Sequence, residues 1–228
     1  MLTEKIISGW NLQIIDMLKL YRININHFKD PLEDKKLLQL VGDSRRQKVL
    51  RYLMPDDRKR SLGAGIIIRK ILYENGLCEG CLKYSENGKP VADNVFFNIS
   101  HGGDYVVGVA SDCEIGCDIE KNGNAPLEVA ERYFYLSELE YIRSAADKNR
   151  AFFTLWTLKE SYMKMTGRGM SLPLDSFEVV PQGEGFILGR SVEKECFFKT
   201  EEFDSHIFSV SRELPFTLDP TDFHEIFL

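Results

Sequence analysis

The strongest constraint on the fold of this chain is a run of three short apolar segments with turns between them. Val95–Ile99, Tyr105–Ala110 and Glu114–Glu120 have the length and composition of strands, and polar or glycine residues separate them. Helical patterns of apolar residues precede them over Ser61–Tyr73 and follow them over Arg150–Met165. This arrangement of strands and helices predicts a mixed α+β fold.

Weaker patterns complete the outline. Ser61 is expected to begin the first long helix, and Asn75-Gly76 to end it. A helix over 137–146 would be capped by Ser137, with Glu140 at the capping-box position. The remaining expectations are a strand-and-loop pattern over 1–30, helices over 37–41, 44–60 and 127–135, and antiparallel strands over 177–210.

Charge divides the chain near residue 112. Residues 1–112 carry 17 Lys and Arg against 14 Asp and Glu, whereas residues 113–228 carry 12 against 21. We therefore expect an N-terminal subdomain over 1–112, with a basic region at 44–60, and an acidic C-terminal subdomain over 113–228. The acidic half is not expected to bind nucleic acid, because phosphate contacts need Lys and Arg. An acidic half beside a basic one suits a metal joined to a phosphorylated ligand.

The composition is that of a folded soluble protein, with 43% hydrophobic and 28% charged residues. Apolar runs such as Ile66-Ile67-Ile68 are far shorter than the roughly 20 residues that a membrane span needs. Glu4 stands early in an N-terminus that has no long apolar core, so we expect no secretory signal. Without an export signal, the five cysteines are expected to be reduced thiols in the cytoplasm.

Two cysteine pairs raise the question of a zinc site. Cys78 and Cys81 flank a Glu-Gly dipeptide, and Cys113 and Cys117 stand four residues apart in a turn and strand. Cys117 would face away from Asp118. The four sulfurs are therefore not expected to meet around a zinc ion.

The segment Gly116-Cys117-Asp118-Ile119-Glu120 is the most informative cluster. In a strand, Asp118 and Glu120 project to one face, while Cys117 and Ile119 project to the other. Two adjacent carboxylates repel each other unless a positive charge lies between them. A hard divalent cation such as Mg²⁺, shared with substrate phosphates, would satisfy both. The alternative is an ordinary strand with a solvated polar face.

A second cluster lies on the long helix over 150–165. Trp156, Glu160 and Lys164 are four residues apart and share one helix face. Taken alone, they could equally be a core tryptophan beside a surface salt bridge, which contributes little to stability.

The third cluster is Asn98-Ile99-Ser100-His101-Gly102-Gly103, which follows an apolar strand. The hydroxyl of Ser100 and the imidazole of His101 could bind a phosphate. The alternative is a turn in which Ser100 hydrogen-bonds its own backbone.

In this order, the three clusters resemble the motifs of the 4′-phosphopantetheinyl transferases, and in particular of their long Sfp type. Gly88-Lys89-Pro90 and the segment GRGMSLPLDSF at 167–177 are similar to further segments of that type, so the resemblance covers about residues 44–180. Cys117 replaces a usually aliphatic residue, and a buried cysteine behaves as a small hydrophobe. The resemblance implies a monomer of two similar α/β subdomains in a pseudo-two-fold arrangement, with the active site in the cleft between them.

The resemblance also implies a reaction. The 4′-phosphopantetheine group of coenzyme A would move to a serine of an apo acyl, peptidyl or aryl carrier protein, with Mg²⁺ (or Mn²⁺) and with release of adenosine 3′,5′-bisphosphate. Asp118, Glu120 and Glu160 match the acidic residues that hold the metal. Glu160, or a metal-bound water that it orients, would be the general base. Lys164 would contact the phosphates and stabilise the transition state.

The residues that align with coenzyme A contacts come from both halves of the chain. Arg60 and His101 are the strongest of them. Lys159 lies within the helix motif, but its spacing points it away from the face of Glu160, so its expected role is weaker. The full set is Arg45, Lys48, Arg60, Lys89, Ser100, His101, Asp118, Lys159 and Lys164.

An apolar patch over 127–135, with the aromatic run Tyr133-Phe134-Tyr135, is expected to dock the carrier protein, unless these side chains face the core. Two other functions use the same residues. A metal-dependent hydrolase of coenzyme A or nucleotide pyrophosphates would consume coenzyme A without a carrier. A carrier-binding protein without activity would not need Mg²⁺.

Overall fold

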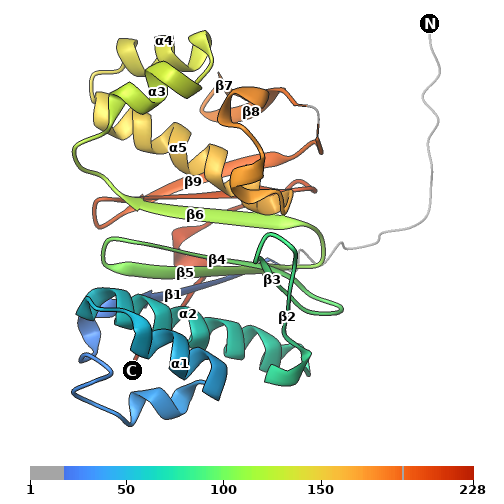
Figure 1. Ribbon diagram of the computed structural model, residues 1–228. Coiled ribbons are helices and arrows are strands. Elements are labelled where there is room, and N and C mark those ends of the chain that lie inside the picture. Colours follow the sequence, from blue (N-terminus) through green and yellow to red (C-terminus); the bar gives the residue numbers. More distant parts are fainter. Residues whose placement is uncertain (1–17, 192) are drawn as a thin grey trace, which may run out of the picture.

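The computed structural model describes residues 18–191 and 193–228. They form a mixed α+β molecule in which the two larger sheets lie between two groups of helices (Figure 1), which confirms the predicted fold class. The strand-and-loop pattern before residue 18 and the expectation about a secretory signal lie outside the described residues. In the part of the chain that is described, no helix combines the length and the apolar content needed to cross a membrane.

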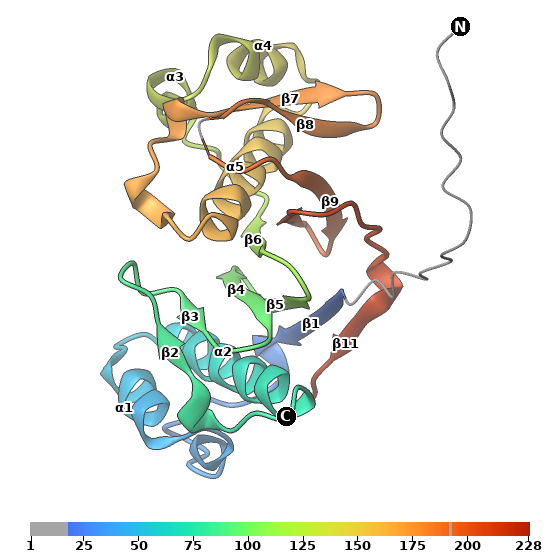
Figure 2. The ribbon, with the colours of Figure 1, turned by 90° about the vertical axis from the view of Figure 1, so that its right-hand side faces the viewer.

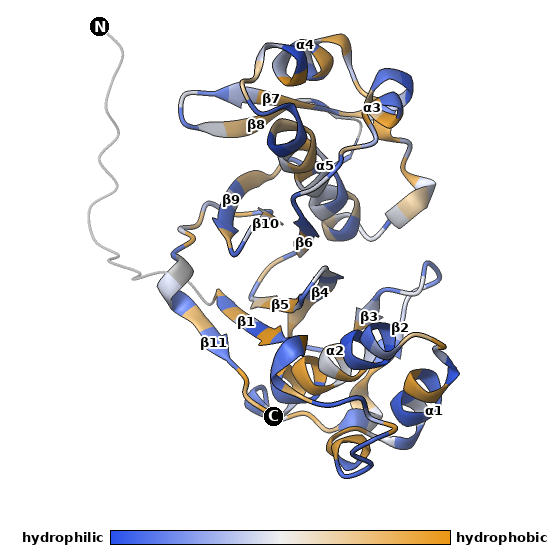
Figure 3. Ribbon diagram, turned by 90° about the vertical axis from the view of Figure 1, so that its left-hand side faces the viewer, coloured by the Kyte–Doolittle hydropathy of each residue, from blue (hydrophilic) through white to orange (hydrophobic). Residues whose placement is uncertain are grey.

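A four-stranded sheet forms the centre of the N-terminal half. In spatial order its strands are β11 (Phe223–Glu225), β1 (Lys19–Asn24), β5 (Tyr105–Ser111) and β4 (Phe96–Gly102). Neighbouring strands are antiparallel, except that β11 runs parallel to β1. Helix α2 (Pro55–Glu74) covers one face, because its residues Ile67 and Ile71 share a core with Val106 of β5. Figure 3 shows the hydrophobic stretches of α2 and β5.

Shorter elements complete this half. They are the helix α1 (Asp43–Arg51), the hairpin of β2 (Lys83–Tyr84) and β3 (Pro90–Val91), and the 3-10 helices η1 (Ile25–His27), η2 (Leu37–Leu40) and η3 (Glu79–Cys81).

The predicted helix start at Ser61 is wrong, because α2 begins at Pro55 and Ser61 is buried inside it. Pro at the first position loses no hydrogen bond, and Asp56 and Asp57 suit the positive end of the helix dipole. The predicted end at Asn75 is confirmed.

The C-terminal half is built on a second, three-stranded antiparallel sheet. Its strands, in spatial order, are β6 (Ile115–Lys121), β10 (His206–Arg212) and β9 (Phe197–Phe203). The other elements are α3 (Leu127–Tyr133), α4 (Leu136–Ser144), α5 (Lys148–Met165), the hairpin of β7 (Glu178–Gln182) and β8 (Gly185–Arg190), and the 3-10 helices η4 (Gly169–Ser171), η5 (Leu174–Ser176) and η6 (Pro220–Asp222). Helix α5 packs on this sheet. The antiparallel strands predicted over 177–210 are confirmed.

The predicted cap of α4 is wrong. Tyr135, not Ser137, is the N-cap, and the Glu138 carboxylate accepts a hydrogen bond of 2.8 Å from the Tyr135 backbone N–H. Glu140 is exposed. The start of α4 is set by tertiary structure, since it brings Glu138 into the core beside Lys159.

The two halves meet along β4 and β6, which lie side by side without belonging to one sheet (Figure 2). Gly102 allows this approach, because a Cβ at that position would lie 2.2 Å from the carbonyl oxygen of Ile119. The Asn98 side chain connects the strands, since its Oδ1 accepts a hydrogen bond of 3.1 Å from the backbone N–H of Cys117. The side chains that follow Asn98 on β4 therefore lie opposite the acidic residues of β6.

Candidate active site

A cleft of about 410 Å³ lies between β4, β6 and α5, and the three sequence clusters meet in it. The strands and the helix contribute both polar and apolar side chains. The residues that line the cleft are Ile99, Ser100, His101, Asp118, Glu120, Trp156, Glu160 and Lys164. The prediction that Trp156, Glu160 and Lys164 share one helix face is therefore confirmed.

Gly116 brings the acidic strand against the helix. It lies on the same face of β6 as Asp118 and Glu120, because residues two apart in a strand share a face. A Cβ at Gly116 would lie 2.0 Å from the carbonyl oxygen of Ser161 and 2.4 Å from the backbone nitrogen of Met165. Only glycine permits this contact between the backbones of β6 and α5.

A hydrogen-bonded triad joins the two halves at the cleft. The Lys164 ammonium donates to Asp118 Oδ1 at 2.5 Å and to Ser100 Oγ at 2.9 Å, and Ser100 Oγ donates to the same Asp118 oxygen at 2.7 Å. Burial lowers the pKa of Lys164, but the neighbouring acidic groups, with Asp118 first among them, together outweigh it and the pKa is raised. Lys164 is therefore a permanent positive charge in the cleft.

The carboxylates of the cleft are crowded. Burial and the neighbouring Asp118 raise the pKa of Glu120 to about 7, and the same two causes raise the pKa of Glu160. Asp118 Oδ2 is buried and has no hydrogen-bond partner among the described residues. The site thus stabilises additional positive charge beyond that of Lys164.

This donor set fits a hard divalent cation, which binds carboxylate oxygens and would satisfy the unpaired Asp118 oxygen. Within residues 18–191 and 193–228, no three His, Cys, Asp or Glu side chains are already gathered as a metal site. Asp118, Glu120 and Glu160 are the residues that could hold the ion.

His101 lines the cleft, and Arg60 lies beside the turn that follows His101 on β4. Arg60 donates to the Gly103 carbonyl oxygen at 2.8 Å and to Asp57 Oδ1 at 2.6 Å, which fixes its guanidinium beside the turn after β4. Desolvation of the ring, with the positive charges of Lys164 and Arg60, lowers the pKa of His101. His101 is therefore a neutral hydrogen-bonding group near neutral pH.

Lys89 lies next to the cleft. A smaller hollow of about 200 Å³ contains Lys89, and it shares Ile99 and Lys164 with the cleft. Lys89 Nζ is 3.5 Å from Glu114 Oε2. Burial lowers the pKa of Lys89, and Glu114 opposes this shift.

Comparisons with known proteins decide the family. A model described as 4′-phosphopantetheinyl transferase, N-terminal, matches residues 31–113, and one described as the 4′-phosphopantetheinyl transferase superfamily matches residues 114–218. A Bacillus subtilis protein, 4′-phosphopantetheinyl transferase ffp, is 35% identical over 197 residues, which cover 82% of this chain and 88% of the relative. The chain belongs to the 4′-phosphopantetheinyl transferase family.

One further relative and one solved structure were also found to be similar. The 4′-phosphopantetheinyl transferase Sfp of Bacillus subtilis strain 168 is 32% identical over 201 residues, which cover 82% of this chain and 88% of Sfp. The crystal structure of Thermotoga maritima holo-[acyl-carrier-protein] synthase matches with a TM-score of 0.38 and 16% identity, over 43% of this chain and 61% of the synthase. The predicted resemblance to the Sfp type is confirmed, and the protein is an enzyme of this transferase family.

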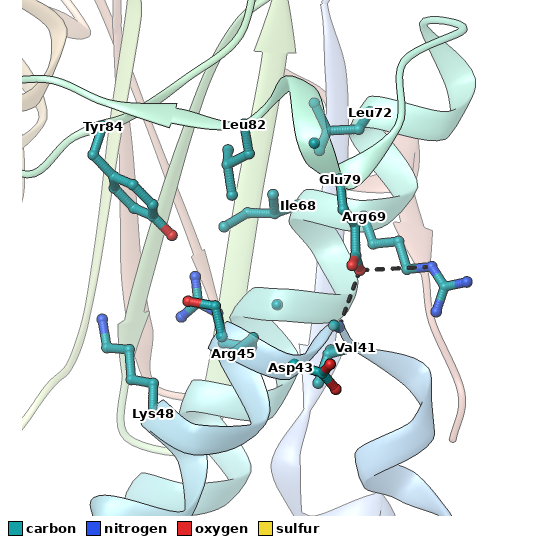
Figure 4. A pocket seen from close by; sticks show the side chains of 14 residues that line it. Val41, Asp43, Arg45, Lys48, Ile68, Arg69, Leu72, Glu79, Leu82 and Tyr84 are labelled. Atoms are coloured by element: carbon teal, nitrogen blue, oxygen red, sulfur yellow. Dashed lines mark hydrogen bonds and ion pairs between the residues drawn. The ribbon is translucent and has the colours of Figure 1, made fainter.

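Two predicted site residues of this transferase line a different cavity. Arg45 and Lys48 lie on α1 beside a cavity of about 380 Å³, with Tyr84 of β2 on its opposite side (Figure 4). Sequence reasoning missed Tyr84 and Glu79, which line the same cavity, because no local pattern connects β2 or η3 with α1.

Lys159 does not reach the cleft of the transferase. It is fully buried on the other side of α5, where it donates to Glu138 Oε1 at 2.6 Å and to the Phe177 carbonyl oxygen at 2.8 Å. The structure therefore does not bring Lys159 together with the other predicted coenzyme A contacts. Glu138 is a residue that sequence reasoning missed, and its burial could not be read from an ordinary helix pattern.

The aromatic run after α3 is divided between core and surface. Phe134 is buried and stacks on Phe152, Tyr135 is half-buried, and only Tyr133 is exposed. The expectation of three exposed aromatic side chains is wrong for Phe134, because the end of α3 packs against α5.

Proposed function

We propose that this transferase moves the 4′-phosphopantetheine group of coenzyme A to a serine of an apo acyl or peptidyl carrier protein and releases adenosine 3′,5′-bisphosphate. The observation that supports this most is the cleft itself. Asp118, Glu120 and Glu160 line it together with Lys164, and one oxygen of Asp118 has no hydrogen-bond partner among the described residues. Such a site suits a ligand that brings both a divalent cation and phosphate groups.

Asp118, Glu120 and Glu160 would hold Mg²⁺, with Mn²⁺ as the alternative metal. When bound, the ion would offset negative charge on the pyrophosphate of coenzyme A. The carboxylates supply oxygen ligands only, which is the set that these two metals prefer.

Lys164 would bind a phosphate oxygen. Its ammonium already lies in the cleft and donates to Ser100 and Asp118. A pyrophosphate oxygen can accept from the remaining N–H, and His101 adds a neutral donor from β4. Ser100 would donate to the phosphate once its O–H leaves Asp118, which a bound cation would favour. Charge that develops on the leaving phosphate would be stabilised by this fixed positive charge.

Glu160 would be the general base. Its carboxylate would accept the proton of the carrier serine hydroxyl as the serine oxygen attacks the β-phosphorus. Burial and the Asp118 charge raise the pKa of Glu160 in the metal-free protein. A bound cation would lower that pKa again, so the position of the carboxylate in the cleft is what supports this role.

Residues outside the cleft would hold the rest of coenzyme A. Arg60 and Lys89 border the cleft, while Arg45 and Lys48 line the cavity beside α1. These cations would bind the 3′-phosphate and adenosine end of the ligand. Lys159 is not part of this set, because it is buried with Glu138.

The proposal also covers the oligomeric state, the location and the domain arrangement of the enzyme. We propose that it acts as a monomer in the cytoplasm, with residues 1–112 and 113–228 as two subdomains related by a pseudo-two-fold axis. Both halves of one chain line the cleft, so no second copy is needed to supply a residue. Neither nucleic acid nor a membrane is expected as a partner.

The test is intact-mass spectrometry of an apo acyl carrier protein after incubation with the transferase, coenzyme A and Mg²⁺. We expect the carrier to gain one phosphopantetheine group, and a chelator to prevent the gain. Loss of coenzyme A without modification of any apo carrier would instead indicate a pyrophosphate hydrolase. Unchanged coenzyme A and unchanged carriers would contradict the proposal.

A further inference from the structure

Cys78 and Cys81 form a pair that the active site does not use. They stand at the two ends of η3, and the Cys81 backbone N–H donates to the Cys78 carbonyl oxygen at 2.9 Å. This turn brings the two sulfurs to 3.5 Å from each other. A disulfide needs about 2.05 Å between sulfurs, so a small change in side-chain rotation would close the bond.

Access separates this pair from Cys113 and Cys117, and the acidity of the thiol separates Cys78 from Cys117 and Cys196. Cys78 is exposed and Cys81 is half-buried, whereas Cys113 and Cys117 are buried in the core. The hydrogen bond from the Cys81 thiol, with backbone N–H groups of the turn, lowers the pKa of Cys78. Burial raises the pKa of Cys117 and of Cys196 to about 12. Since the thiolate is the reactive form, Cys78 is the thiol that reacts first with an oxidant.

We propose that Cys78 and Cys81 close to a reversible disulfide in exchange with a low-molecular-weight disulfide such as oxidised glutathione. The Cys78 thiolate attacks one sulfur of glutathione disulfide, which forms a mixed disulfide and releases one glutathione thiolate. The Cys81 thiolate then attacks the Cys78 sulfur and releases the second glutathione. The protein loses two thiol protons and two electrons, and the glutathione disulfide gains them.

The turn that would change lies in the wall of the cavity beside α1. Glu79, between the two cysteines, accepts a hydrogen bond of 3.1 Å from the Gly42 backbone N–H at the start of α1, and it lies 3.9 Å from Arg69 Nε (Figure 4). A carboxylate in this position stabilises the N-terminal end of the helix. Closing the disulfide rotates the side chains on both sides of Glu79, and this changes how its carboxylate meets the start of α1, the helix that carries Arg45. Ligand binding in this cavity is therefore weaker in the oxidised protein.

The first test is mass spectrometry of the full chain after treatment with oxidised glutathione and alkylation of the remaining thiols. The proposal predicts a peptide in which Cys78 and Cys81 are joined and unalkylated, and in which a reductant restores both thiols. Cys81→Ser should retain a glutathionyl group on Cys78, because no resolving thiol is left. Cys196→Ser is the matched control and should close the disulfide as the wild type does. Alkylation of both Cys78 and Cys81 after the oxidant would overturn the proposal.

The second test measures the dissociation constant of coenzyme A for the reduced and the oxidised protein, and this step rests on the proposed function. We expect oxidation to weaken binding about fivefold or more, the lower end of typical coupling between sites. The double variant Cys78→Ser/Cys81→Ser should bind equally under both conditions. Equal affinities of the two wild-type forms would overturn the link to the cavity. Absence of coenzyme A binding even in the reduced protein would contradict the proposed function, while the mass measurement would still decide the disulfide.

Discussion

Gly116 determines how closely β6 can approach α5, and hence whether the acidic residues of the strand can meet Glu160 and Lys164. In Gly116→Ala, the added methyl group would lie 2.0 Å from the Ser161 carbonyl oxygen. We expect the variant to lose about 1–3 kcal/mol of unfolding free energy, as overpacked cores do. Urea denaturation measures this loss directly.

Gly123→Ala is the matched control for this prediction. It lies in the loop after β6, where the nearest atom to an added Cβ is the Lys121 carbonyl oxygen at 3.9 Å. Its urea midpoint should stay close to that of the wild type. Equal midpoints for the two alanine variants would show that β6 and α5 are not in contact at Gly116.

Glu120 gives the stability of the protein a distinct pH dependence. Its pKa rises from an ordinary value of 4.5 to about 7, first through burial and then through Asp118. Between these values the folded protein binds more protons than the unfolded chain, so the free energy of unfolding falls as pH rises. The raised pKa of Glu160 acts in the same direction.

We expect the melting temperature of the metal-free protein to fall between about pH 5 and about pH 8, and Glu120→Gln to show a shallower fall. Mg²⁺ should raise the melting temperature more at the higher pH, because the cation binds ionised carboxylates. Calorimetry with a chelator and with Mg²⁺ measures both effects. Identical pH profiles for Glu120→Gln and the wild type would contradict this account.

At this scale the sequence predicts much of the site. The two-residue period of a strand correctly places Asp118 and Glu120 on one face, and helical spacing correctly groups Glu160 with Lys164. The same helical spacing correctly points Lys159 away from the face of Glu160, but it does not predict that Lys159 is fully buried. Its burial depends on Glu138, which arrives from another helix and carries no local signal.

At the scale of elements, the pair of Lys159 and Glu138 fixes α5 against α4. Both side chains are fully buried, and Glu138 Oε1 also accepts from the Val179 backbone N–H at 2.8 Å. Burial lowers the pKa of Lys159, and the Glu138 charge opposes the shift. Lys159→Met would leave Glu138 without its cation, which costs about 3–5 kcal/mol of unfolding free energy.

Arg150→Met is the comparison for this pair. Arg150, on the same helix as Lys159, forms an exposed ion pair with Glu202 of β9 at 2.6 Å. Its removal should cost less than about 1 kcal/mol. Denaturant unfolding of both variants compares a buried pair with an exposed one. A loss in Lys159→Met as small as that in Arg150→Met would mean that the buried pair does not hold α5.

Helices and strands were largely predictable, but several of their ends were not. Apolar periodicity correctly indicates α2, α5 and the strands β4, β5 and β6. The start of α2 at Pro55 depends on the chemistry of the helix end. The start of α4 at Leu136 depends on a buried ion pair. Neither feature contributes to the apolar periodicity.

At the scale of the whole molecule, the C-terminal strand returns to the first sheet. β11 pairs with β1, and the guanidinium of Arg22 on β1 lies 4.8 Å from the Phe223 ring and 4.5 Å from the Phe203 ring of β9. No sequence pattern predicts this connection, because β11 has only three residues and its partner is 203 residues away. The division near residue 112 therefore describes the charge distribution better than it describes the sheets.

The cleft exists only when the two halves are together. Ser100 comes from the first sheet, Asp118 from the second, and Lys164 from the helix that covers the second. The resemblance of the motifs predicted that these residues act together. It did not predict that Arg45 and Lys48 line a separate cavity, because their distance from the cleft depends on how α1 packs on α2.

The most direct test of this account is the initial rate of carrier modification by Glu160→Gln. The substitution keeps the size of the side chain and removes the carboxylate that we propose as the base, so we expect the rate to fall at least about a hundredfold. Glu140→Gln, on the exposed surface of α4, is the control and should retain the wild-type rate. Circular dichroism should show that both variants are folded. A rate for Glu160→Gln close to that of Glu140→Gln would contradict the proposed site.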